Sequence, residues 1–140
     1  MTSIVLIIKA LLTIKVVMNV KIDTREKMHV IRIHESSLAA NMTEKMEKVL
    51  LPLLNDNVKN AILNMKDIKM IDSAAAEHLV KLQHRFYDSR ASFVVCEFQP
   101  EVKKMLDNSG KLEHLNYTPT VSEAIDIVQM EEIEREFDEL

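Results

Sequence analysis

Hydrophobic and polar residues alternate along residues 19–24 and 28–34, and both segments are rich in β-branched side chains. The short polar run TREK connects them. An apolar period of two on either side of a polar turn is typical of two antiparallel strands. We therefore predict a β-hairpin at the beginning of the domain.

The pattern changes to a helical period after this hairpin. Apolar residues recur three and four positions apart over residues 42–54, and either Asn41 or Thr43 is suited to cap the start of a helix. Pro52 lies near the end of the pattern, where its missing N–H should bend or loosen the last turn. We predict a helix that ends before the polar run NDN.

Two continuous apolar runs, residues 60–65 and 92–98, predict buried strands. Each is followed by a helical pattern, the first over residues 74–88 and the second from Pro100, a favoured first residue of a helix. A last helix should begin near residue 121. The helix over 74–88 has an inner stripe at a spacing of 4, 3 and 4 and a polar outer side; the stripe is Ala75, Leu79, Leu82 and Phe86, and the outer residues include Glu77, Lys81 and His84.

This order of elements predicts the fold class. Strands that alternate with helices after an opening hairpin favour a single α/β domain with a mixed, mainly parallel sheet and about four helices. A length of 140 residues fits one domain. In such sheets, functional groups gather where strand carboxyl ends meet helix N-termini. Ser73 lies at a junction of that kind.

The two ends of the chain differ from the body. Residues 1–17 form an apolar N-terminal extension, interrupted by Lys9 and Lys15 and lacking a basic leader or a cleavage site, which disfavours both a signal peptide and a membrane span. An apolar segment of this size favours contact with another subunit, so we predict a homo-oligomer formed through it.

Residues 131–140 are predicted to be an acidic amphipathic helical tail. Apolar residues continue the last helix at a spacing of 3, 4 and 3, at Met130, Ile133, Phe137 and Leu140. The pattern favours docking of this stripe on its own domain over a role in partner binding.

The composition limits the classes of protein to which the chain can belong. The chain is 47% hydrophobic and 29% charged, as in soluble globular proteins. Its net charge is −4, and the last ten residues hold six acids and one arginine, so the remainder is nearly neutral. Without a basic surface we expect no nucleic-acid partner.

The numbers of cysteine, histidine and glycine residues bear on metal and cofactor binding. The one cysteine, Cys96, fits a reducing compartment such as the cytoplasm, and the five histidines lack metal-ligand spacing, so we expect no metal. Gly110 is the only glycine, which argues against phosphate-binding glycine loops. We expect no cofactor.

Ser73 has three interpretations. Asp72 or Ser73 can cap the following helix, with Glu77 near the position of a capping box. A catalytic nucleophile needs an adjacent base, and neither a G-x-S-x-G elbow nor a well-placed histidine is present. A phosphoryl group at a helix start would meet favourable backbone amides, so covalent marking is compatible with capping.

The runs AILNMKDIKMIDSAA and SFVVCEFQPEVKKMLDNSGKLEHL closely resemble the STAS domain, and within it the bacterial anti-sigma factor antagonists. The resemblance extends over residues 18–130. It implies that the chain is not an enzyme but a partner-switching protein, whose partner is an anti-sigma factor with serine kinase activity. The kinase would phosphorylate Ser73 and so end binding. The contact face implied at the helix start consists of Asp72, Ser73, Ala74, Ala75, Glu77 and His78.

The sequence departs from the family pattern directly after Ser73. The family usually carries a second serine and a glycine there, whereas this chain has three alanines, Ala74, Ala75 and Ala76. The alternative function is that of a STAS-type accessory binding subunit in a membrane transport or lipid-trafficking complex, with no insertion of this chain into the membrane itself.

Overall fold

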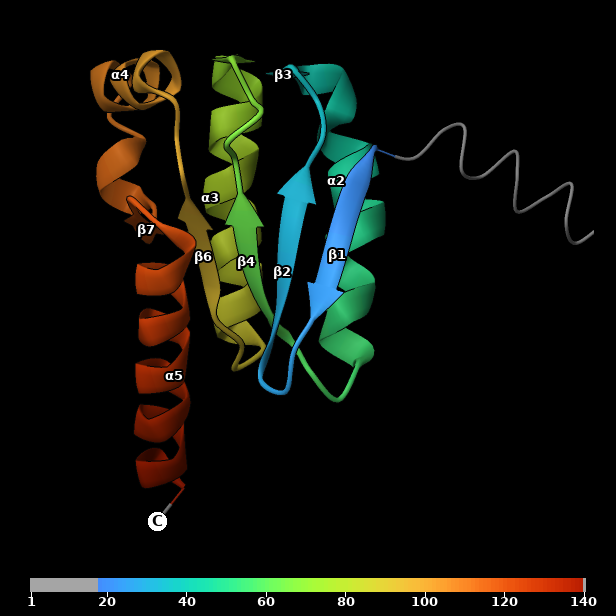
Figure 1. Ribbon diagram of the computed structural model, residues 1–140, viewed down its shortest axis with the longest axis vertical. Coiled ribbons are helices and arrows are strands. Elements are labelled where there is room, and N and C mark those ends of the chain that lie inside the picture. The colour runs from blue at the N-terminus through green and yellow to red at the C-terminus, as the bar shows by residue number, and fades with distance from the viewer. Residues whose placement is uncertain (1–17, 140) are drawn as a thin grey trace, which may run out of the picture.

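The structure, a computed structural model, describes residues 18–139 (Figure 1). Predictions about residues 1–17 and about Leu140 lie outside this part of the chain. The strands are β1 (Val20–Thr24), β2 (Met28–Ile33), β3 (Ser37–Leu38), β4 (Asn60–Asn64), β5 (Met70–Ile71), β6 (Phe93–Cys96) and β7 (Tyr117–Thr118). The α-helices are α2 (Thr43–Leu50), α3 (Ser73–Asp88), α4 (Pro100–Asn108) and α5 (Val121–Asp138), and three short 3₁₀ helices are η1 (Ala40–Met42), η2 (Leu51–Asn55) and η3 (Leu112–His114).

A five-stranded sheet forms the centre of the molecule, in the order β1-β2-β4-β6-β7. The β1–β2 hairpin is antiparallel, and every other neighbouring pair in this sheet is parallel. In register, Ile31, Leu63 and Val95 lie side by side across the three central strands. The predicted fold class, a mixed and mainly parallel α/β domain opened by a hairpin, is confirmed.

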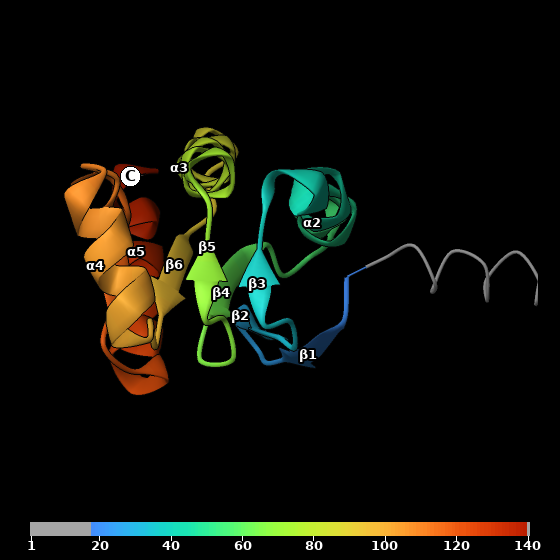
Figure 2. The ribbon, with the colours of Figure 1, turned by 90° about the horizontal axis from the view of Figure 1, so that it is seen from above.

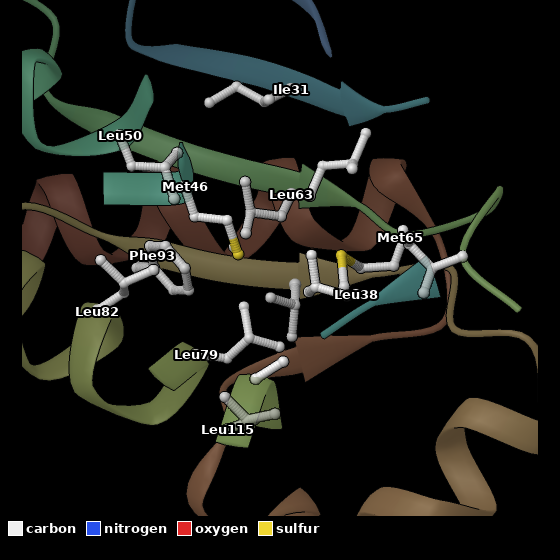
Figure 3. Packing of buried hydrophobic residues seen from close by; sticks show 14 of the residues in the cluster. Ile31, Leu38, Met46, Leu50, Leu63, Met65, Leu79, Leu82, Phe93 and Leu115 are labelled. Atoms are coloured by element: carbon white, nitrogen blue, oxygen red, sulfur yellow. The ribbon is translucent and has the colours of Figure 1, made fainter. Parts of the chain in front are cut away.

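Helices cover both faces of the sheet (Figures 1 and 2). On one face, side chains from α2, α3 and α4 pack against the strands; Figure 3 shows Met46 and Leu79 of this layer near Leu63 and Phe93 of the sheet. On the other face, Ala124 and Val128 of α5 pack on a smaller cluster. Because both faces are covered, the central strands β4 and β6 are buried along their whole length, which explains their continuous apolar sequences.

The predicted inner stripe of α3 is confirmed. Ala75, Leu79, Leu82 and Phe86 are all buried, while Glu77, Lys81 and His84 are exposed. Gly110 adopts a left-handed conformation with φ of 73° just after α4, as is common where a helix ends.

The start of α2 differs from the prediction. Neither Asn41 nor Thr43 caps this helix; the residue before it is Met42, whose side chain makes no capping bond. Instead η1 runs directly into α2, and the Thr43 hydroxyl donates back to the Ala40 carbonyl. At its other end α2 gives way to η2 at Leu51, and Pro52 lies in that 3₁₀ turn, in line with the predicted loosening.

Three short strands were absent from the sequence prediction. β3, β5 and β7 have two residues each, too few for an apolar period to be seen. The predicted strand over 92–98 is also shorter, because Glu97 has a positive φ of 60° and turns the chain out of β6.

Residues 131–138 of the acidic tail belong to α5, which continues without a break to Asp138. The predicted docking of its apolar stripe on the domain is wrong. Met130, Ile133 and Phe137 remain 61%, 54% and 68% exposed. Within residues 18–139, no helix combines the length and apolarity needed to cross a bilayer.

Candidate functional site

Ser73 is the first residue of α3 and is exposed to solvent. It follows β5 directly, at the edge of the molecule where the parallel strands end and the helices begin. In the described part of the chain, its hydroxyl forms no hydrogen bond with another protein group. The side chain is therefore accessible and not occupied by capping.

Asp72 supplies the cap. Its Oδ1 accepts from the Ala75 N–H at 2.8 Å, so Asp72 rather than Ser73 fills the capping position that the sequence left open between them. Its Oδ2 accepts from the Ala40 N–H at 2.9 Å, at the start of η1. One carboxylate thus satisfies the free amides of two helical segments. The N–H donors of Ala75 and Ala40 hold the pKa of the Asp72 carboxyl below its ordinary value.

The backbone that leads into Ser73 is fixed by a two-stranded parallel pairing of β3 with β5. The Lys69 N–H donates to the Ser36 carbonyl at 2.7 Å, and the Asp72 N–H donates to the Leu38 carbonyl at 3.1 Å. Leu38 and Ile71 anchor this pairing in the core. The position of the Ser73 hydroxyl is therefore set by structure on both sides of it.

An open depression lies between Ser73 and α4. Its other lining residues are Glu101, Lys104, Met105, Asn108 and Ser109. The wall from α4 thus presents one cation and one anion beside the hydroxyl. Such a surface suits contact with another molecule rather than enclosure of a small substrate.

Some of the predicted contact residues are exposed in the structure and others are buried. Asp72, Ser73, Ala74 and Glu77 lie on the surface. Ala75 does not: it is fully buried, because it begins the inner stripe of α3, so its assignment to the contact face is corrected.

His78 is also turned away from this surface. Its side chain is only 11% exposed, and its Nε2 lies 2.9 Å from Oε1 of Glu47 on α2. Its Nδ1 is buried without a hydrogen-bond partner in the described residues. His78 therefore joins α3 to α2 and is not positioned to act as a base for Ser73.

Sequence reasoning missed Met70 at this site. Met70 in β5 is 71% exposed and lies three residues before Ser73. Its neighbour Ile71 points into the core, so the alternation of a strand carries Met70 outward. Two residues are too few for that alternation to mark a strand in the sequence.

The STAS domain family model matches residues 19–124 of this chain. A candidate anti-sigma factor antagonist from Thermotoga maritima has a TM-score of 0.69 at 18% sequence identity, covering 79% of this chain and 94% of that one. For an anti-sigma factor antagonist from Mycobacterium paratuberculosis the TM-score is 0.66 at 12% identity, with coverage of 80% and 94%. The murine anion transporter Slc26a9 matches with a TM-score of 0.65 at 12% identity, over 77% of this chain and 18% of that one. At these identities, the similarities show a shared fold.

Proposed function

This chain belongs to the STAS domain family, and we propose that it is an anti-sigma factor antagonist that binds an anti-sigma factor with serine kinase activity until Ser73 is phosphorylated. In this role the chain is not an enzyme, because the kinase carries out the phosphoryl transfer. It works in the cytoplasm, without a cofactor.

The observation that carries the proposal is the exposed Ser73 hydroxyl at the first position of α3. Asp72 takes over the capping bonds, so a kinase gains access to the hydroxyl without uncapping the helix. The paired backbone of β3 and β5 fixes the position of Ser73 before a partner binds, which lowers the entropy lost on docking.

Phosphorylation would change this surface through charge and bulk. A phosphoryl group adds a charge of roughly −2 and three acceptor oxygens. The free amides at the start of α3 and the Lys104 ammonium in the neighbouring depression favour that charge in the isolated protein. A partner that fits the unmodified face would meet a bulky dianion at the exposed start of α3 and would dissociate.

The alanines after Ser73 define what the kinase must accept. Ala74 follows Ser73 in the first turn of α3 and is exposed. Directly after the serine, the family pattern usually carries a second serine and then a glycine. The Ala74 methyl group occupies space near the hydroxyl, so the matching kinase needs room there.

A phosphorylation assay tests the proposal. The purified chain is incubated with ATP and an anti-sigma factor kinase from the same organism, whose activity is verified on an established substrate, and phosphate is located by mass spectrometry. We expect one phosphoryl group on Ser73, lost in Ser73→Ala. Ser122 is the matched control because it is also exposed in the first turn of a capped helix, so Ser122→Ala should accept the group normally.

Two results would count against the proposal: no incorporation by the active kinase, or incorporation that persists in Ser73→Ala. The alternative, an accessory subunit of a transport complex, rests on fold similarity and predicts binding that does not depend on a phosphate at Ser73.

A further inference from the structure

In the second half of α5, apolar side chains face solvent and polar side chains face the domain, which is the reverse of an ordinary surface helix. Its first turns bury Ala124 and Val128 against the sheet. From Met130 onward the apolar side chains Met130, Ile133 and Phe137 point to solvent. In a helix that covers a core, apolar side chains normally face inward.

Polar side chains occupy the inward side of these turns. The Tyr87 hydroxyl donates to Oε1 of Glu131 at 2.7 Å. The Asn60 amide donates to Oε1 of Glu132 at 2.7 Å. These two bonds attach the helix to α3 and to β4.

Arg135 adds a third attachment one turn later. Its Nη2 donates to Oδ1 of Asn60 at 3.1 Å and to the Ser92 hydroxyl at 3.0 Å, and its side chain is only 16% exposed. Turning α5 to bury Phe137 would break this network and leave its buried polar groups without hydrogen-bond partners. The outward position of the apolar residues is therefore fixed.

The exposed residues have the spacing of a docking helix. Met130, Ile133 and Phe137 lie at i, i+3 and i+7, the positions by which an amphipathic helix contacts a partner. We define the α5 outer face as these three residues with Asp126 and Glu134, two exposed acids that helical periodicity places on the same side.

The charge of the α5 outer face selects what can cover it. Packing two such faces together would bring Asp126 and Glu134 of both copies into one interface, where like charges repel. The matching surface must be apolar and positively charged.

Residues 1–17 have that chemistry. The segment is mostly apolar, contains Lys9 and Lys15, and has no acidic residue. It joins the described domain at Met18, which packs with α2 on the opposite face of the sheet from α5. The segment leads into β1, which lies at the opposite edge of the sheet from β7, the strand that precedes α5. A second copy of the chain can offer the segment to α5 without leading it around the sheet.

We propose that residues 1–17 of one copy bind the α5 outer face of a second copy, with Lys9 and Lys15 paired to Asp126 and Glu134. Each copy carries both partners, so a reciprocal exchange between two copies closes as a symmetric dimer. This inference does not depend on the phosphorylation of Ser73.

Sedimentation equilibrium of the full chain tests the apolar part of the proposal. We expect a dimer whose dissociation constant rises at least about tenfold when Met130→Gln, Ile133→Gln and Phe137→Gln are combined. Met70→Gln is the matched control, because Met70 is equally exposed but lies elsewhere, and it should leave the dissociation constant unchanged. Circular dichroism verifies that each variant is folded.

Charge reversal identifies the two partners. Lys9→Glu with Lys15→Glu should weaken the dimer, as should Asp126→Lys with Glu134→Lys, and all four together in one chain should restore it. A monomeric full chain would overturn the proposal. So would a dimer that tolerates the triple glutamine variant, or a fourfold charge variant no tighter than the two double variants.

Discussion

Helices α3 and α5 lie on opposite faces of one sheet and place their apolar side chains in opposite ways. In α3 every residue of the predicted apolar stripe is buried and the charged residues face solvent. In the last turns of α5 the apolar residues face solvent and the inward side is polar. An amphipathic pattern thus identifies two sides of a helix, but the contacts of the neighbouring elements decide which side is inward.

The same comparison extends to the starts of the two helices. Thr120 caps α5 through its own hydroxyl, which accepts from the Glu123 N–H at 3.2 Å. Asp72 caps α3 and also binds the amide of Ala40, 32 residues earlier in the chain. The start of α5 is a local structure, whereas the start of α3 is tied to a second element and carries the candidate site.

Replacing one phenylalanine in each helix gives the largest predicted difference. Phe86 of α3 is fully buried, with its ring centroid 5.1 Å from that of Phe93, so Phe86→Ala should lower the free energy of unfolding by about 3–5 kcal/mol. Phe137→Ala should change it by less than about 0.5 kcal/mol. Urea denaturation of dilute protein, where self-association contributes nothing, measures both; equal losses would show that Phe137 is a core residue after all.

Removing the polar attachment of α5 should have an intermediate effect. Arg135→Ala leaves Asn60 and Ser92 without their shared donor, and we expect a loss of about 2 kcal/mol. Glu134→Ala, on the exposed side of the same turn, should change stability by less than about 0.5 kcal/mol. If the two variants unfold at the same urea concentration, the network does not hold the helix.

The two caps should differ in their response to acid. The pKa of Asp72 is lowered from an ordinary value of 3.8, so its stabilising effect is complete above that pH and is lost as the pH falls through the lower pKa of the folded state. Asp72→Asn should therefore flatten the decline of stability in acid.

A hydroxyl cap does not titrate in this range, so Thr120→Ala should lower stability by about 1 kcal/mol at every pH. Thermal unfolding from pH 2 to pH 6 separates the two variants. An acid response of Asp72→Asn identical to that of the unmodified chain would remove the charged-cap interpretation.

Local patterns in the sequence predicted much of the fold. The hairpin, the buried strands β4 and β6 and the inner stripe of α3 all have enough residues for a period to be seen. Other contacts join residues far apart in the chain. Examples are the hydrogen bond between the Ala40 N–H and the Asp72 carboxylate, and those of Arg135 with Asn60 and Ser92. No local pattern encodes them, and for that reason the inversion of α5 was missed.

The candidate site was predicted in part. The position of Ser73 at the mouth of a helix came from the resemblance and from the strand-to-helix junction. The helical pattern already placed Ala75 in the inner stripe of α3, whereas the resemblance placed it on the contact face, and the structure follows the pattern. The turn of His78 toward Glu47 depends on how α2 packs on α3, which the sequence around Ser73 does not contain.

Calorimetric titration with the anti-sigma factor kinase, in the absence of ATP, tests the central claim most directly. We predict that Ser73→Ala binds as tightly as the unmodified chain, that Ser73→Asp and the chain phosphorylated on Ser73 bind at least about tenfold more weakly, and that Ser122→Asp is unaffected. Equal affinity of the phosphorylated and unmodified chains for the kinase would contradict the account.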